Sequence, residues 1–399
     1  MRLNLVKAGL LSASTLVAAQ NESPELEPFS LFDNRVIYKA REGESLSYPR
    51  HVELESGELL VTASLRTNLT SPTYFPVFES EDGGVSWEWV SNITDQVNGW
   101  GMSAQPALME LTEPIGDYSA GTILASGNSW SQNGTRIDVY ASLDKGRSWE
   151  FVSRVTQGGR PNTTNGADPV WEPFLMLYDH QIVCYYSDQR DPLHGQKLAH
   201  QTSPDLKTWG PVINDVAYDL YIARPGMTVV AKIETMDKYI VVYEYPIGNS
   251  SSHGANYPVH YRIASDPLLF DSAEDHPIVI GGNFAPNASP YVVWSPVGGP
   301  NGTIIVSDAD YDEVYTNRFG GDPDKWVKNY SPQPGAYSRA LHVFQNKTDH
   351  LMILGGSKFE GGPPDLTLSV VSITEMHANS TEGEPGPGCP AQKSKRRTR

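Results

Sequence analysis

Short apolar runs, rather than helical periodicity, dominate the hydrophobic pattern of this chain. Val, Ile, Leu, Tyr and Phe gather in segments of a few residues, and Gly, Asn, Asp and Pro separate these segments. β-branched and aromatic runs between turn-forming residues are typical of strands, whereas an amphipathic helix needs apolar residues every three or four positions. The pattern therefore predicts an all-β chain.

One unit of this pattern recurs six times: a start that in most copies contains proline, an apolar strand, a turn and a second apolar strand. The aligned residues of the copies are Pro49, Pro106, Pro173, Pro225, Pro290 and Arg339. Six such hairpins arranged radially bury one another's faces, so the repeat predicts a single six-bladed β-propeller. Proline at these starts biases the residue before it to extended geometry.

The ends of the chain complete this picture. The early run NRVIYKA is expected to close the ring by pairing with a late strand such as LTLSVVSI. The propeller is expected to span residues 28–375, and residues 376–399, which end in the basic block KSKRRTR, are expected to form a disordered tail.

Two related turns occur at SEDGGVSW, Ser80 to Trp87, and SLDKGRSW, Ser142 to Trp149. In each, an Asp side chain accepts backbone N–H groups across a tight turn and a Gly allows positive φ. The two segments resemble the Asp-box of sialidase-like propellers, and SPDLKTW, Ser203 to Trp209, is a weaker relative without the Gly. A calcium loop is disfavoured because neither copy supplies the alternating carboxylates and distal Glu of such a loop. Asp-boxes lie between third and fourth strands, so function is expected on the opposite rim.

Composition and charge narrow the class of protein. The first 19 residues have Arg2 and Lys7 before an apolar run that ends in small residues, the pattern of a cleaved secretory signal. Asn-x-Ser/Thr sequons follow at Asn21, Asn68, Asn92, Asn133, Asn162, Asn249, Asn287, Asn301, Asn329, Asn346 and Asn379. The formal net charge of −17 argues against nucleic acid or an anionic membrane as partner. These features predict a secreted extracellular protein that acts as a monomer.

Candidate chemistry gathers where first strands start and second strands end. The residues before the six aligned positions are Tyr48, Gln105, Glu172, Arg224, Ser289 and Ser338, and the second strands end with Arg66, Asn128, Asp188, Glu244 and Asp308. Glu172 in PVWEPF and Glu244 in IVVYEYP lie in apolar surroundings, where an ionised carboxylate must be paired or its pKa rises. Adjacent blades would bring both carboxylates to one rim, as glycoside hydrolysis requires.

The segments YPRHVELESGELLVTAS, NGWGMSAQPAL, DPVWEPFL, YYSDQR, ARPGMTVV and VVYEYP together resemble the fungal exo-1,5-α-L-arabinanase family, glycoside hydrolase family 93. The resemblance implies a six-bladed propeller that releases arabinobiose from linear α-1,5-L-arabinan by a retaining mechanism with no cofactor. It implies Glu172 and Glu244 as the catalytic pair, with Glu172 assigned as general acid/base and Glu244 as nucleophile.

Eight further residues are predicted to bind the sugar, by hydrogen bonds or by stacking. They are Arg66, Trp100, Asn128, Trp171, Asp188, Arg224, Tyr245 and Tyr337. The ten histidines show no ligand-like spacing, so no metal is predicted, and only His51 is placed where a channel ion or water would sit.

Two alternatives stay open. One is a sialidase-like glycosidase, in which Arg50, Arg224 and Arg339 would grip a carboxylate, although YPRHV departs from the sialidase arginine-isoleucine-proline signature. The other is a sugar-binding propeller without turnover, because fold alone does not determine function.

Overall fold

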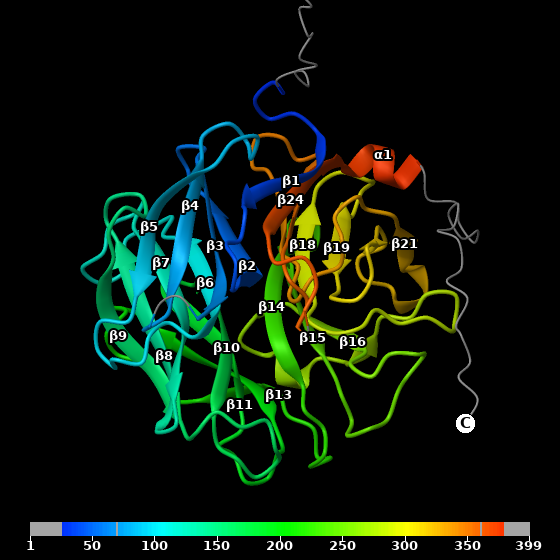
Figure 1. The fold of residues 1–399 in the computed structure, drawn as a ribbon. Helices are drawn as coiled ribbons and strands as arrows, with labels where there is room; N and C mark the ends of the chain where they lie inside the picture. The colour runs from blue at the N-terminus through cyan, green and yellow to red at the C-terminus, as the bar shows by residue number, and fades with distance from the viewer. Residues whose placement is uncertain (1–25, 69–70, 360, 379–399) are drawn as a thin grey trace, which may run out of the picture.

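Six antiparallel sheets of four strands each surround a common axis in the computed structural model, which describes residues 26–68, 71–359 and 361–378 (Figure 1). The predicted signal, the sequons at Asn21 and Asn379 and most of the predicted tail lie outside these residues. The predicted six-bladed β-propeller is confirmed.

The blades follow one another along the chain, each with its first strand innermost. Blade one contains β2 (Glu44–Glu53), β3 (Leu59–Thr67), β4 (Tyr74–Ser80) and β5 (Glu88–Thr94). Blade two contains β6 (Ala104–Glu110), β7 (Ile123–Ser131), β8 (Gly134–Ser142) and β9 (Glu150–Gly158). Blade three contains β10 (Val170–Tyr178), β11 (Gln181–Asp188), β12 (Lys197–Ser203) and β13 (Ile213–Val216). Blade four contains β14 (Gly226–Ile233), β15 (Lys238–Glu244), β16 (Val259–Ala264) and β17 (His276–Pro277). Blade five contains β18 (Tyr291–Ser295), β19 (Thr303–Ser307), β20 (Val314–Asn317) and β21 (Val327–Asn329). The described helices are short: η1 (Glu234–Met236), η2 (Phe270–Ser272), η3 (Pro323–Lys325) and α1 (Ile373–Ala378).

The sixth blade joins the two ends of the chain. It consists of β22 (Leu341–Val343), β23 (His350–Gly355), β24 (Leu366–Ser372) and β1 (Phe32–Tyr38), in that order. β1 pairs antiparallel with β24, with Val36 opposite Thr367, and Figure 1 shows the blue β1 beside the red-brown β24. The predicted closure is therefore confirmed, and it leaves the ring without a free gap between first and last blades.

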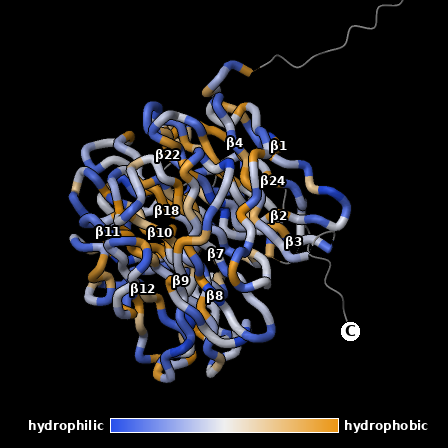
Figure 2. Tube along the Cα trace, turned by 90° about the vertical axis from the view of Figure 1, so that its left-hand side faces the viewer, coloured by the Kyte–Doolittle hydropathy of each residue, from blue (hydrophilic) through white to orange (hydrophobic). Residues whose placement is uncertain are grey.

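The core lies between the faces of neighbouring blades. Leu60 of β3, Ile123 of β7 and Tyr140 of β8 are fully buried in one such cluster, and Val183, Val241 and Tyr243 form another between blades three and four. Figure 2 shows hydrophobic positions concentrated in strands such as β10 and β18, with hydrophilic loops outside. Packing of this kind holds the rims at a constant geometry.

The Asp-box turns connect third and fourth strands. Asp144 accepts hydrogen bonds from the Ser148 N–H and Ser148 hydroxyl at 2.8 and 2.6 Å, and the Gly146 N–H donates to Ser142 Oγ at 2.8 Å. Asp82 makes the same contacts. In the weaker relative, Asp205 accepts two backbone N–H groups and Leu206 takes the positive φ (64°).

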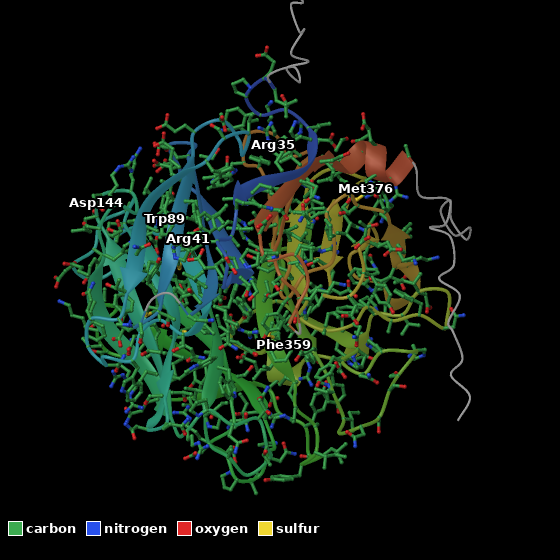
Figure 3. The ribbon with its side chains drawn as sticks, in the orientation of Figure 1. Arg35, Arg41, Trp89, Asp144, Phe359 and Met376 are labelled. Atoms are coloured by element: carbon green, nitrogen blue, oxygen red, sulfur yellow. The ribbon has the colours of Figure 1, made fainter. Side chains whose placement is uncertain are left out.

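These turns lie on the rim where first strands end. Ser80, at the end of β4, pairs with Leu59 at the start of β3, and Leu59 in turn lies opposite Glu53, the last residue of β2. Figure 3 shows Asp144 at the outer edge of the molecule. The expectation that the Asp-boxes lie opposite the rim where first strands begin is met.

The backbone geometry at the starts of the first strands differs from the extended geometry that the sequence predicted. The residue before the aligned position has positive φ, not extended geometry, at Tyr48 (55°), Gln105 (61°), Glu172 (63°), Ser289 (46°) and Ser338 (54°). In blades one to four the register shifts at this point, as between Trp171 and Phe174, so a β-bulge overrides the bias from proline. In blade four the shift falls between Gly226 and Val229, and Met227 has the positive φ (65°). The alignment on Pro225 was therefore wrong, and Met227 rather than Arg224 corresponds to Glu172.

Candidate active site

Positive-φ residues at four of the strand starts connect neighbouring blades around the rim, because the backbone N–H of each donates to a side chain outside its own sheet. The Gln105 N–H donates to Ser64 Oγ, and the Glu172 N–H donates to Gln105 Oε1. The Met227 N–H donates to Glu172 Oε2 and the Ser289 N–H to Glu244 Oε2, at 2.7 and 2.8 Å. In each case the acceptor is a side chain of the preceding blade. Strained backbone at these positions thus holds both predicted glutamates.

Glu172 and Glu244 meet at Gly226. Gly226 pairs with Glu244 across β14 and β15, and a Cβ atom on Gly226 would lie 3.4 Å from Glu172 Oε2 and 3.6 Å from Glu244 Oε1. These two oxygens are therefore at most about 7 Å apart, the sum of the two distances. Any larger side chain at this position would fill the space between the carboxyl groups.

The two carboxyl groups have different partners. Glu172 Oε2 accepts the Ser187 hydroxyl at 2.7 Å in addition to the Met227 N–H, and Gln105 Nε2 lies 3.5 Å from Glu172 Oε1. Glu244 accepts the Ser289 N–H. Hydrogen bonds donated to a carboxylate stabilise its charged form, so Glu172 is the better stabilised anion of the pair.

The pKa values follow from this arrangement. Burial and the negative charge of Glu172 together raise the pKa of Glu244 to about 8, although the Ser289 hydrogen bond and the Arg224 charge oppose this rise. Burial also raises the pKa of Glu172, but the bonds from Ser187 and Met227 and the charges of Arg224 and Arg50 oppose this. The raised pKa of Glu244 and the larger number of hydrogen bonds donated to Glu172 both favour Glu244 as the member of the pair that holds a proton near neutral pH.

Arg224 and Tyr337 lie beside the pair. The Arg224 guanidinium donates to Gln189 Oε1 and Gln196 Oε1 at 2.9 and 2.8 Å, and its charge favours the ionised form of both glutamates. The Tyr337 hydroxyl contacts Met227 Sδ at 3.9 Å, and burial, followed by the charges of the two glutamates, raises the Tyr337 pKa well above its ordinary value. The structure thus brings these two predicted residues close to Glu172 and Glu244.

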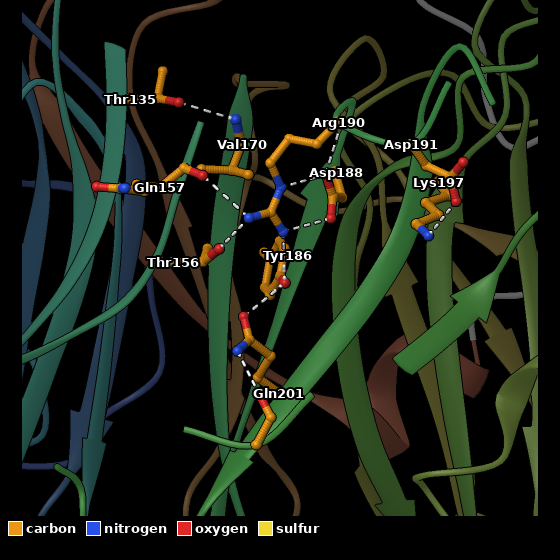
Figure 4. Close-up of polar contacts among 11 residues, drawn as sticks. Thr135, Thr156, Gln157, Val170, Tyr186, Asp188, Arg190, Asp191, Lys197 and Gln201 are labelled. Carbon is orange, nitrogen blue, oxygen red and sulfur yellow. Dashed lines mark hydrogen bonds and ion pairs between the residues drawn. The ribbon is translucent and has the colours of Figure 1, made fainter. Parts of the chain in front are cut away.

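Trp171 and Asp188 are tied into the protein. Trp171 Nε1 donates to Gln189 Oε1 at 2.8 Å, and the indole is largely buried. Asp188 is 2% exposed and forms a two-point ion pair with Arg190 at 2.8 and 2.6 Å, as Figure 4 shows. The Arg190 N–H also donates to Asp188, so this carboxylate is occupied by protein groups and orients a loop instead of facing the rim.

The other four predicted residues are more scattered. Asn128 is fully buried in β7, and the Arg136 guanidinium covers Trp100 at 4.9 Å from the ring centroid. Arg66 is exposed on β3, and it pairs across the sheet with Ser45. Tyr245, directly after Glu244, is half-buried and stacks on a neighbouring tyrosine at 4.0 Å between ring centroids.

Sequence reasoning missed several residues that surround the pair. They are Gln105, Ser187, Gln189, Gln196, Gly226, Met227 and Ser289. Gln105 and Ser289 belonged to the predicted ring of strand starts but were not assigned to the site. Ser187, Gly226 and Met227 follow only from the pairing of β10 with β11 and of β14 with β15, and Gln189 and Gln196 lie in the loop between β11 and β12, where they accept from Arg224.

His51 and Arg339, which the sequence offered as ion-binding and carboxylate-binding residues, each contact other groups of the protein. His51 packs against His342, with ring centroids 4.7 Å apart, beside a cavity of about 400 Å³. Arg339 is fully buried and donates to three backbone carbonyls, so it does not join Arg224 in a carboxylate-gripping cluster.

Within residues 26–68, 71–359 and 361–378, no group of three or more His, Cys, Asp or Glu side chains is placed to hold a metal ion. In the same residues no helix has the length and apolar character to cross a bilayer.

Comparison with solved structures shows close relatives. An α-L-arabinofuranosidase from Fusarium graminearum, solved in complex with an iminosugar inhibitor and with arabinobiose, is 43% identical with a TM-score of 0.83. An α-L-arabinanase from Penicillium chrysogenum complexed with arabinobiose is 36% identical with a TM-score of 0.82. Each match covers 87% of this chain and 99% of the other. The NanB sialidase of Streptococcus pneumoniae, at 10% identity and a TM-score of 0.54, shares the fold. No family model and no curated protein sequence matches.

A closed six-bladed Asp-box propeller with two carboxyl groups facing each other on one rim, and with these relatives, is a glycoside hydrolase of the arabinan-degrading kind. More particularly, the chain belongs to glycoside hydrolase family 93. The resemblance read from its sequence motifs is confirmed, and its likeness to sialidases is one of fold.

Proposed function

We propose that this protein is a secreted, exo-acting α-1,5-L-arabinanase that releases arabinobiose from linear arabinan with retention of anomeric configuration. The observation that carries the proposal is the approach of Glu172 and Glu244 to within about 7 Å across Gly226. Retaining glycosidases hold their carboxyl groups about 5–5.5 Å apart, which this upper limit admits, whereas most of the range of about 6.5–9.5 Å found in inverting enzymes lies above it. The arabinobiose bound in both close relatives supports the choice of substrate.

The ionisation of the pair favours an order of roles opposite to the one inferred from the sequence resemblance. Glu172, as the better stabilised carboxylate, attacks the anomeric carbon and forms a glycosyl–enzyme ester. Glu244, which holds the proton, gives it to the glycosidic oxygen as the C–O bond breaks. Glu244 then removes a proton from the water that attacks the anomeric carbon and releases Glu172.

Exo action is supported by the loops beside the pair. Loops 189–196, 217–225 and 245–258 are joined by the Gly195 N–H to the Tyr221 carbonyl at 3.0 Å and the Arg224 N–H to the Pro246 carbonyl at 3.1 Å. We infer that three loops connected in this way close the site on the blade-three and blade-four side of the glutamates. A closure of this kind stops a polysaccharide end, so that cleavage occurs at a constant distance from it.

Product analysis on linear arabinan tests the proposal. We expect arabinobiose from the earliest time points by chromatography, with the α configuration in the first-formed product by NMR. Mixed oligosaccharides would contradict exo action, and a β product would contradict retention. Glu172→Gln and Glu244→Gln should each lose about 10²-fold or more in kcat/KM.

Two controls separate the alternatives. Release of sialic acid from a fluorogenic sialoside, without action on arabinan, would replace the proposal by a sialidase-like activity. Saturable binding of arabinan without new reducing ends would indicate a binding propeller.

A further inference from the structure

Asn128 and Gln105 form a buried chain of amides that ends at Glu172. Asn128, fully buried in β7, donates from Nδ2 to Gln105 Oε1 at 2.7 Å and to the Val170 carbonyl at 3.3 Å. Gln105 Oε1 also accepts the Glu172 N–H at 3.1 Å, and Gln105 Nε2 lies 3.5 Å from Glu172 Oε1. Gln105 therefore contacts Glu172 twice, at its backbone and at its carboxylate.

The hydrogen bonds allow only one orientation of each amide. The Gln105 carbonyl oxygen receives two donors, which satisfies both of its lone pairs. If the Gln105 amide were flipped, its NH₂ would face the donors of Asn128 and Glu172, and its oxygen would face a carboxylate oxygen. Asn128 is held the same way, because a flip would turn its own oxygen towards the acceptors Gln105 Oε1 and Val170 O. The Asn128 NH₂ group thus directs the Gln105 NH₂ group towards Glu172.

We propose that Gln105 is a positioning residue for the Glu172 carboxylate, and that Asn128, predicted from sequence to bind sugar, acts instead by fixing the orientation of the Gln105 amide. This proposal rests on the proposed function of Glu172. Gln105 stabilises the charged form of Glu172 and holds the carboxyl group at its bulge, while Asn128 touches no substrate because it is fully buried. The bulge geometry supports this, since Gln105 and Glu172 occupy the same position in blades two and three with φ of 61° and 63°.

A double-mutant cycle tests the connection. Gln105→Met removes the amide with little change in volume, and Asn128→Leu removes the donor to it. We expect each to lower kcat on linear arabinan about tenfold, with KM little changed, because a hydrogen bond to a charged group is lost away from the sugar. The double variant should be no slower than Gln105→Met alone, because Asn128 acts through Gln105. Ser129→Ala is the matched control: Ser129 is equally buried on the same strand, but its hydroxyl faces Asp95, so activity should be unchanged.

A second measurement does not depend on activity. In protein labelled with ¹³C at glutamate carboxyl carbons, the Glu172 signal is assigned by its loss in Glu172→Gln. Its titration midpoint should move to higher pH in Gln105→Met and in Asn128→Leu, and stay in place in Ser129→Ala. If Asn128→Leu does not fold, as judged by its thermal unfolding, Asn128→Ser makes the same test with a smaller side chain.

The outcomes are distinct. Additive losses in the double variant, or an unchanged Glu172 midpoint in Asn128→Leu, would overturn the proposal. A protein that does not cleave arabinan, but whose Glu172 midpoint moves as expected, would overturn the proposed function and leave the positioning of Glu172 by Gln105 and Asn128 supported.

Discussion

Replacing Glu244 by Gln should make the protein more stable near neutral pH while abolishing most of its activity. Glu244 keeps its proton in the folded state up to about pH 8, compared with an ordinary value of 4.5. An unfolded chain releases that proton near pH 4.5. Between these values the native state binds one more proton than the unfolded state, so the parent loses stability as pH rises and regains none of it above pH 8.

The magnitude follows from the pKa change. The free energy of unfolding of the parent should fall by about 1.4 kcal/mol per pH unit from this group, and by about 3 kcal/mol in total between pH 4.5 and 7. Glu244→Gln has no proton to lose, so it lacks this slope. The Ser289 N–H can still donate to its amide oxygen.

The assay is urea unfolding of the parent and Glu244→Gln at a series of pH values from 4.5 to 8. We expect the two curves of free energy against pH to diverge, with Glu244→Gln the more stable protein at the upper end. Glu172→Gln serves as the comparison, because Ser187 and Met227 already stabilise that carboxylate and a smaller slope is removed. A difference between parent and Glu244→Gln that does not change with pH would refute the assignment of the shared proton to Glu244.

Four further outcomes are expected. With azide and an arabinobioside carrying a good leaving group, Glu172→Ala should form the β-azide and Glu244→Ala the α-azide, and the reverse would restore the order inferred from sequence. Gly226→Ala should lower kcat/KM on arabinan by about 10²-fold or less, because its methyl group would lie between the carboxyl groups; full activity would show that this space is not used. Asp144→Ala should lower the free energy of unfolding by about 1–2 kcal/mol in urea, yet leave kcat/KM unchanged, and lost activity without lost stability would contradict its place on the far rim. In protein secreted by a glycosylating host, peptide mass spectrometry should find Asn329 unmodified, because it is 3% exposed and donates to Thr316 Oγ1; a glycan there would contradict its burial.

Much of the fold was predictable because it depends on local pattern. Apolar runs and turn residues repeat along the chain, and a repeat that cannot bury its own faces must stack on its neighbours. The Asp-box turns were equally readable, since their bonds join residues only two to four positions apart, as between Asp144 and Ser148. The pairing of β1, which contains most of the run NRVIYKA, with β24 followed from the need to close the ring.

The site was predictable only in part. Glu172 and Glu244 stood out because a carboxylate is rare in apolar surroundings, and topology then placed them on one rim. The blade-four alignment failed because its proline precedes the bulge, and Met227 carries no proline signal. Asn128 and Asp188 looked like sugar ligands because polar residues at strand ends often face solvent, but both side chains are occupied by protein partners.

The sequence by itself determined the all-β class, the number of blades and the two glutamates, because these depend on residue type and spacing along the chain. Only the tertiary structure decided how the glutamates are used. The approach of the two carboxyl groups at Gly226 and the contact of Gln105 with Glu172 arise between residues of different blades, and the Asn128–Gln105 hydrogen bond joins two strands of blade two. Such contacts depend on strand register and on the position of each bulge. A register shift of one residue would turn the side chains of a strand to the opposite face, and the spacing of apolar residues along the chain does not specify the register between strands.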